Sequence, residues 1–325
     1  MAPLDNVSHS LAGWALARAA ARARPAGTTL CLILANNLPD VDILLSLRSD
    51  AAYLLYHRGI THSLLGWAVL PLVLALGLWW GYARRTSFGW FCLLAYTGVG
   101  LHLLYDLVTP WGMLLLYPFA LTRFAYDWLF IVDLVTWTAP AVAVLVAWRR
   151  PARSRAAVAG FLLFLLAYGA AAGALHADAR RAVERAETGA GRTVAEAYAF
   201  PLPFAPWRWY GVAIAPPDVP EPTISHYRVG GVPARSGLTH RTDRGFAEPW
   251  AARAIRSPAG QEYLWWAPVP VAETRIAGDV ATVFLQDLRF GSVDPSGAAP
   301  FGLRFRFDRT SGKLLDQRWL SRFEE

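Results

Sequence analysis

The 325-residue sequence is short of charged side chains and of cysteines, and each shortage excludes a class of protein. Charged residues make up 17% of the chain, against about 25% in an ordinary soluble domain. Its two cysteines, Cys31 and Cys92, both fall in apolar segments, which argues against a disulfide framework and a cysteine-based zinc site. The N-terminus lacks the basic start and small-residue cleavage site of a signal peptide, so we expect none. These shortages favour a membrane protein.

The apolar residues concentrate in the first 175 positions. Six segments there are candidate membrane spans, and their bounds are 8–24, 28–47, 64–83, 88–108, 126–148 and 156–175. The third, fifth and sixth are the strongest, since each reaches about 20 mostly apolar residues, enough to cross a hydrocarbon core of about 30 Å. The first two are weaker and could instead be interfacial or re-entrant helices. We therefore expect an α-helical membrane domain of about six segments.

The arginines lie in tight groups beside these runs, at 18–24, 84–85 and 149–155. The net charge of +7 and the pI near 9.7 could suggest nucleic acid, but such grouping is what the positive-inside rule produces, and we expect no nucleic-acid partner. Placing these groups in the cytoplasm puts the loops 48–63 and 109–125, and everything after 175, outside. The expected location is a bacterial inner membrane, crossed several times, with an extracytoplasmic C-terminal domain.

The second half of the chain changes character twice. Residues 176–201 are polar and are predicted to form a helical linker. Residues 202–325 alternate Pro and Gly with runs rich in Val, Ile, Phe, Tyr and Trp, which predicts a small, mostly antiparallel β domain. The predicted strand runs are 208–213, 224–229, 262–266, 280–288 and 303–307, with a final hairpin turn at 310–313.

A small set of ionisable residues is predicted to meet at the outer membrane face. Its members are His9, Asp40, Asp42, His57, His62, His102, Asp106, Asp127 and Asp133. The topology brings them together from five segments, and ionisable groups at membrane depth are costly unless they are functional or paired. His102 and Asp106, spaced i, i+4, share one helix face. Imidazole nitrogen and carboxylate oxygen are ligands that Zn²⁺ accepts.

Several of these residues, and the neighbouring Arg58, also have an ordinary structural explanation. An isolated HxxxD pair is more often a hydrogen-bonded pair than a metal site. Asp40 or Asp42 could cap a helix, and Arg58 could lie among lipid phosphates. Asp127 and Asp133 could be acceptors that orient a ligand histidine, or a proton-relay pair. Four further candidates without ligand spacing are expected at the surface, namely His176, Asp178, His226 and His240.

Four motifs carry a resemblance to a known family. They are DNVSHSLAGWALA at 5–17, NLPDVD at 37–42, HRGITHSLLG at 57–66 and HLLYDLVTPWGMLLLYPF at 102–119. Together they resemble the membrane-bound metal-dependent hydrolases, the YdjM-like proteins, over roughly residues 1–135. The ligand order is similar to that of zinc-dependent phospholipase C and the single-strand-specific nucleases. The resemblance implies these metal ligands: Asp40 or Asp42, His62, His102 and Asp106, with His9 for an adjacent ion.

This chain departs from those soluble enzymes, which carry further ligands soon after HxxxD. Here the next histidine is His176, so one or two divalent ions, with zinc the expected metal, fit better than three. The expected function is hydrolysis at the outer membrane face, with a phosphoester or lipid-linked substrate and membrane lipid as the partner. Catalysis is assigned to Asp42, His57 and Arg58, with Asp40 or Asp42 as general base and Arg58 holding the phosphate.

Two other functions remain open. The first is a non-enzymatic membrane scaffold or envelope-stress protein, in which the polar cluster is a structural metal site or hydrogen-bonded knot. The second is a transporter with an ion site at the midplane. The polar residues at one face and the lack of an evident inverted repeat argue against the transporter.

Overall fold

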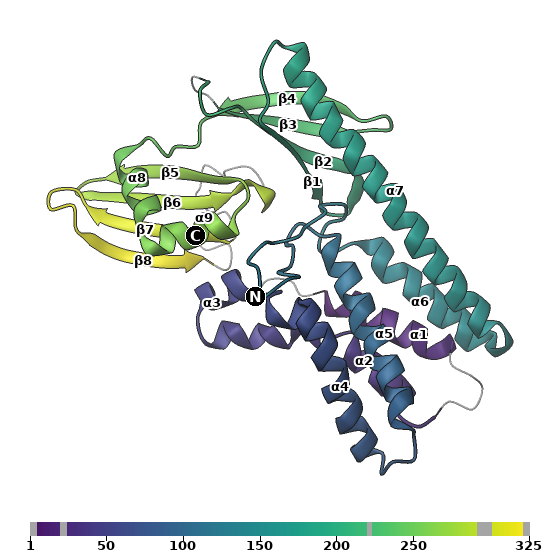
Figure 1. The fold of residues 1–325 in the computed structure, drawn as a ribbon. Coiled ribbons are helices and arrows are strands. Elements are labelled where there is room, and N and C mark those ends of the chain that lie inside the picture. The colour runs from purple at the N-terminus through teal and green to yellow at the C-terminus, as the bar shows by residue number, and fades with distance from the viewer. Residues whose placement is uncertain (1–4, 20–24, 220–222, 291–300, 321–325) are drawn as a thin grey trace.

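The computed structural model describes residues 5–19, 25–219, 223–290 and 301–320. Figure 1 shows a helical bundle with both sheets at its upper end: one packs on the upper half of the longest helix, and the other lies to the left, beside the short helix α3 (Asp50–Tyr56). The helical elements, in chain order, are α1 (Asn6–Ala19), α2 (Thr28–Ala35), the 3-10 helix η1 (Pro39–Leu47), α3 (Asp50–Tyr56), η2 (Ile60–His62), α4 (Leu64–Gly81), α5 (Phe88–Leu107), α6 (Leu134–Arg149), η3 (Pro151–Arg153) and α7 (Ser154–Gly189).

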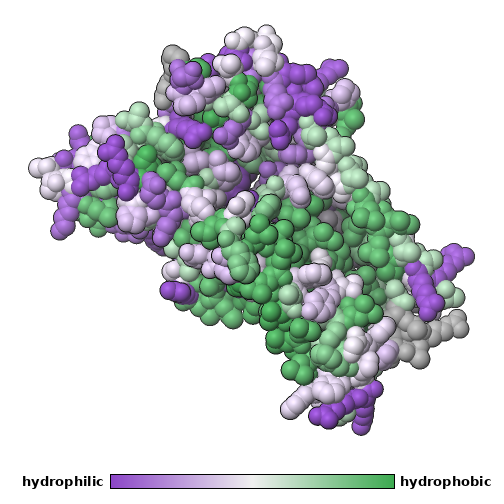
Figure 2. Space-filling model, viewed as in Figure 1, coloured by the Kyte–Doolittle hydropathy of each residue, from purple (hydrophilic) through white to green (hydrophobic). Residues whose placement is uncertain are grey.

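Within the described residues, three helical stretches are long and apolar enough to cross a membrane. They are α4, α5 and Pro151–Gly189, and α2 with η1, bent by 54°, would make a fourth. The predicted six segments are thus not confirmed, since α1 has 14 residues and α6 has 16. Large apolar side chains stay exposed on these helices, Val73 of α4 at 63% and Leu163 of α7 at 65%. Figure 2 shows the resulting apolar surface over the bundle and hydrophilic side chains over the sheets.

The predicted span 126–148 is wrong in its first third. Helix α6 begins at Leu134, because the Asp133 carboxylate accepts hydrogen bonds from the N–H groups of Val135 and Thr136 and so caps the helix. The residues before it form a loop against the end of α5, where Tyr126 N donates to Leu107 O and Trp128 N to Val108 O. This loop closes one side of the site described below.

The β half consists of two separate four-stranded antiparallel sheets. Their strands are β1 (Glu196–Leu202), β2 (Ala205–Ile214), β3 (Ile224–Gly230) and β4 (Arg235–Thr242) in the first, and β5 (Pro270–Ala277), β6 (Val280–Asp287), β7 (Gly302–Asp308) and β8 (Leu314–Leu320) in the second. Each sheet pairs its strands in sequence order. Two helices, α8 (Pro249–Arg256) and α9 (Pro258–Trp266), accompany the second sheet. The antiparallel prediction is confirmed, and the turn at 310–313 does join β7 to β8.

Two expectations for this half are wrong. Residues 262–266 lie in α9, because Pro258 at the first turn and Ser257, whose side chain accepts from Gly260 N, start a helix. His226 is buried in β3, where its ring bonds to the Thr242 and Tyr210 hydroxyls. In addition, α7 runs unbroken through position 175, and its upper half packs on the first sheet through Ala179 and Val183.

The second sheet packs onto the helical bundle beside α3. Trp111 is 2% exposed and its ring lies edge-on to Trp266 of α9, with ring centroids 5.7 Å apart. Buried Arg289, which follows β6, pairs with Asp287 and donates to the carbonyl of Pro110 at 3.0 Å. The loop that leads away from α5 is therefore held by both halves of the molecule.

Candidate metal centre

Three separate elements bring four ligand-type side chains to one buried point. Asp40 comes from η1, His62 from η2 just before α4, and His102 and Asp106 from α5. All four side chains are at most 5% exposed, and each offers an atom within 4.8 Å of the others. The i, i+4 spacing predicted for the α5 pair is thus used in the structure.

The bend before η1 explains how Asp40 reaches this point. The Asn36 amide donates to Leu32 O and the Asn37 amide to Ile33 O, so both side chains bond to carbonyls at the end of α2. Pro39 has no N–H to continue the α-helical ladder, and η1 starts there at a new angle. Close packing keeps the bend in place, because a Cβ on Gly98 would lie 2.5 Å from Ala35 Cβ.

The distances fit a bound cation. His62 Nε2 and His102 Nε2 are 3.1 Å apart, and Asp106 Oδ2 is 3.1 and 3.2 Å from them. Asp40 Oδ1 is farther, at 3.6 and 3.7 Å from the same two nitrogens. A tetrahedral zinc site with bonds of about 2.0–2.1 Å has ligand–ligand separations of about 3.3–3.4 Å. The four atoms therefore surround a volume of the size that one ion needs.

The outer nitrogen of each imidazole has a hydrogen-bond partner that assigns the tautomer. His102 Nδ1 donates to the carbonyl of Asn36 at 2.7 Å. The Thr61 hydroxyl donates to Asp42 Oδ2 at 3.0 Å, so its oxygen accepts from His62 Nδ1 at 3.0 Å. Both Nε2 atoms thus direct lone pairs at Asp106 Oδ2, a buried oxygen without a hydrogen-bond donor among the described residues. Converging lone pairs of this kind require a cation or a proton.

The pKa of His62 also indicates that the surrounding side chains stabilise positive charge at this point. Burial alone would lower it, but the carboxylates of Asp106, Asp40 and Asp42 that face the ring raise the pKa of His62 to about 10 when no cation is bound. The carboxylates around this ring therefore stabilise a cation, which is the electrostatic requirement for a divalent metal site.

Asp42, His57 and Arg58 form a second layer around these ligands. Asp42 accepts from His57 Nδ1 and from the backbone N–H of Arg58, both at 2.8 Å. The Arg58 guanidinium is buried and donates to Asp106 Oδ1 at 2.8 Å and to the Thr109 hydroxyl at 2.6 Å. The structure thus places Asp40 among the four convergent side chains, whereas Asp42 belongs with Asp40 and His57 to a second group of possible ligands.

His9 lies on the other side of Asp106. Its ring stacks on His102 with centroids 3.9 Å apart, and its Nε2 is 3.5 Å from Asp106 Oδ1. Its Nδ1 is buried without a hydrogen-bond partner in the described part of the chain. His9 is not among the four convergent side chains, and its role beside an adjacent ion stays a prediction.

Neither Asp127 nor Asp133 belongs to the convergent group. Asp133 caps α6 and accepts from the Tyr168 hydroxyl at 2.9 Å. Asp127 lies within electrostatic range of Asp287 and Arg289, and burial raises its pKa to about 7. The interpretation of this pair as acceptors for a ligand histidine is not supported. The residues that do orient the ligands include Thr61 and the Asn36 carbonyl, which ligand-type spacing could not identify.

The comparisons with known proteins agree with a membrane location. No curated protein and no solved structure matches the chain. One family model, described as YdjM inner membrane protein, matches residues 4–177, slightly more than half of the chain, and this stretch contains the whole candidate metal centre. The chain therefore belongs to the YdjM inner membrane protein family.

Proposed function

We propose that this protein is an integral membrane metal-dependent hydrolase that cleaves a phosphoester at the outer face of the membrane. The observation that carries the proposal is the convergence of His62, His102, Asp106 and Asp40 on one buried, cation-sized point. A divalent ion there, with zinc the expected metal, would supply Lewis-acid chemistry by polarising a phosphoryl oxygen and activating water.

The surrounding residues suggest a division of roles. His62, His102 and Asp106 are the closest three and would hold the ion. Asp40 is set farther back, and among the described residues its Oδ2 accepts one long hydrogen bond, of 3.2 Å from Asn6, so we assign the general base to Asp40. Asp42 suits that role less well than sequence spacing suggested, because His57, Arg58 N–H and Thr61 already donate to it.

Arg58 and His9 would contact the anionic substrate. Each has a buried nitrogen without a hydrogen-bond partner among the described residues, Arg58 Nε and His9 Nδ1. Arg58 also bears on the number of ions. Its guanidinium already neutralises Asp106 Oδ1, the oxygen nearest His9, so a second ion there would meet a fixed positive charge. We therefore propose one ion per site.

The proposed side of the membrane follows from charge. The basic loops at 84–85 and 149–155 follow α4 and α6, whereas the metal centre lies where α4 begins and α5 ends. The positive-inside rule assigns the basic loops to the cytoplasm. The centre and both sheets would then lie on the extracytoplasmic side.

Hydrolysis is tested with the full chain purified in detergent. Phosphodiesterase and lipase substrates are assayed with and without a chelator, beside the double variant His102→Ala, Asp106→Ala. We expect chelator-sensitive release of product in the wild type and none in the double variant. Activity that persists unchanged in the double variant would refute the proposal.

A second function is favoured by one specific observation. The four side chains are nearly inaccessible, and four protein ligands can close a tetrahedral site, as they do in structural zinc centres. A structural centre would make the protein a membrane scaffold. Chelation would then lower the unfolding temperature sharply while no substrate is hydrolysed at any metal content, whereas an enzyme loses activity on chelation and recovers it when metal is restored.

A further inference from the structure

A cavity of about 590 Å³ reaches the metal centre from the side of the helical bundle. It lies between the start of α1, the end of α5, the loop before α6 and the middle of α7. Ligand sites commonly have volumes of about 300–1,000 Å³, so the space is large enough for a substrate group. Its position connects one candidate ligand, Asp106, to the apolar exterior of the bundle.

The two ends of the cavity differ in chemistry. At one end lie Asp5, His9 and Asp106, the last of which is a candidate metal ligand. At the other end the walls are hydrocarbon, supplied by Leu101, Leu162 and Leu165. The lining on α7 extends from Leu162 to Ala170, which is about 12 Å along a helix axis at about 1.5 Å per residue.

The rim of the cavity belongs to the apolar exterior. Leu104 of α5 is 63% exposed and Leu166 of α7 is 72% exposed, and both lie in candidate membrane spans. In a bilayer such side chains contact lipid rather than water. A group that enters between them therefore comes from the hydrocarbon layer.

From this geometry we propose that the cavity binds one hydrocarbon chain of a membrane lipid, which enters sideways between α5 and α7. The lipid's phosphate lies at the polar end, beside His9 and within reach of the positive charge of Arg58. The proposal rests on the proposed function for its chemistry and names the substrate class of that site: a long-chain lipid phosphoester. The chain binds by apolar burial, and the phosphate is attracted by the guanidinium of Arg58, which is hydrogen-bonded to the lining residues Asp106 and Thr109.

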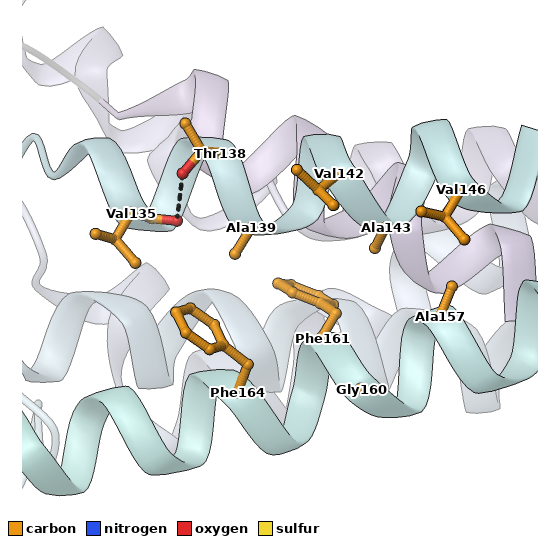
Figure 3. Close-up of a pocket in the computed structure, with 10 residues that line it drawn as sticks. All are labelled: Val135, Thr138, Ala139, Val142, Ala143, Val146, Ala157, Gly160, Phe161 and Phe164. Atoms are coloured by element: carbon orange, nitrogen blue, oxygen red, sulfur yellow. Dashed lines mark hydrogen bonds between the residues drawn. The ribbon is translucent and has the colours of Figure 1, made fainter.

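A neighbouring apolar groove differs from the cavity because it has no ionisable end. It runs between α6 and α7, with a volume of about 380 Å³, and Val142, Phe161 and Phe164 are among its lining (Figure 3). Thr138 supplies the one hydroxyl group in the lining of this groove, and it donates a hydrogen bond to Val135 O at 3.4 Å. The lining contains no ionisable side chain, so the groove has nothing to hold a headgroup and serves as a control surface.

Two glycines of α7 offer a matched pair of variants. Gly169 lines the cavity and Gly160 lines the control groove, and a Cβ at either position would meet no atom within 4 Å. Gly169→Phe should therefore fill the cavity without a backbone clash. Gly160→Phe makes the same change, with the same gain in helix propensity, away from the metal centre.

The test uses the full chain in vesicles that contain a phosphatidic acid with a photoreactive group near the end of one acyl chain. After irradiation, we expect labelled peptides from α5 near Leu101 and from α7 near Leu165. Gly169→Phe should reduce this labelling by about tenfold or more, because the ring occupies the volume that the chain needs. Gly160→Phe should leave it unchanged. Equal labelling in Gly169→Phe and wild type, or no label at these positions, would overturn the proposal.

A second measurement separates this inference from the proposed function. Labelling is repeated after chelation, where we expect it to persist, since chain binding needs no metal. Hydrolysis is compared for a short-chain, water-soluble phosphate ester and for its long-chain analogue. Gly169→Phe should impair only the long-chain reaction. If Gly169→Phe hydrolyses both esters at wild-type rates, the proposal that the cavity binds a lipid chain is refuted, while the proposed hydrolase function stands. If the wild type is labelled but hydrolyses neither ester, the proposed hydrolase function is refuted, while the proposal of chain binding stands.

Discussion

His62 and His102 are 40 positions apart in the sequence, yet their Nε2 atoms lie 3.1 Å from each other with both outer nitrogens hydrogen-bonded. Two neutral imidazoles in these tautomers repel at that distance unless a positive charge lies between or beside them. The carboxylates of Asp106 and Asp40 surround the same point. This relationship is the physical basis of the proposed metal centre.

Asp42 should control metal affinity without being a ligand. The two carboxylate oxygens of Asp42 accept hydrogen bonds from His57 Nδ1 and Arg58 N–H. Asp42→Asn replaces one of these oxygens with an amide nitrogen, which cannot accept. The loop that positions His62 therefore loses a hydrogen bond that holds it. Loss of an outer partner of this kind typically lowers metal affinity by about 10–100-fold. Competition with a fluorescent chelator measures the change. Asp50→Asn, an exposed change in the first turn of α3, is the control and should bind metal as the wild type does.

Gly66 should be essential for placing His62. A Cβ at Gly66 would lie 2.2 Å from Ile60 O and 2.7 Å from Thr61 O, so Gly66→Ala must push η2 away from α4. Gly77→Ala is the control on the same helix, where a Cβ meets no atom within 4 Å. We expect Gly66→Ala to lose bound metal, and Gly77→Ala to keep it while gaining up to about 1 kcal/mol in helix stability. Equal metal content in both variants would contradict this role.

Arg289 should hold the second sheet against the bundle. Its side chain is 5% exposed, pairs with Asp287 at 2.6 Å and donates to Pro110 O. Arg289→Met leaves Asp287 as a buried, unpaired charge, which typically costs about 3–5 kcal/mol. Limited proteolysis should then cleave the chain between the bundle and the second sheet. Arg306→Met, at an exposed position of β7, should resist proteolysis as the wild type does. A protected Arg289→Met would show that apolar packing alone holds this interface.

Asp127 should make stability depend on pH. Burial raises its pKa to about 7, with Arg289 opposing the shift, whereas the unfolded chain keeps a value of about 4. Between about pH 4 and 7 the folded protein therefore binds a proton that the unfolded chain has released, and stability falls as pH rises. Asp127→Asn removes this titration, and Asn tolerates the backbone at φ 56°. Its unfolding temperature should match the wild type near pH 4 and exceed it above pH 7; a difference independent of pH would exclude this cause.

The sequence predicts the ligands better than it predicts their surroundings. Helical spacing places His102 and Asp106 on one face, and the span pattern places His62 at the same membrane face, but their role as metal ligands comes from the family resemblance. The choice between Asp40 and Asp42 depends on the bend after α2, which arises from side-chain-to-backbone bonds of Asn36 and Asn37 that a residue pattern does not specify. Thr61 and the Asn36 carbonyl bond to the Nδ1 atoms of His62 and His102. Their residue types do not predict this role, which depends on where the fold places them.

The errors in the fold have similar causes. Residues 126–133 are apolar enough for a span, yet their backbone N–H groups bond to the end of α5 and Asp133 caps the helix that follows. Residues 262–266 have strand-forming side chains, but the Ser257 cap and Pro258 start a helix whose buried face packs on the second sheet. In both places a capping residue determines where a helix begins, and neither hydropathy nor strand propensity predicts that position.

The metal content of the purified full chain tests the central claim most directly. Elemental mass spectrometry of the wild type should find about one divalent ion per chain, the number that the four convergent ligands can hold. The double variant His102→Ala, Asp106→Ala should contain none, and the control His240→Ala should match the wild type. A double variant that keeps its metal at full stoichiometry would contradict the account.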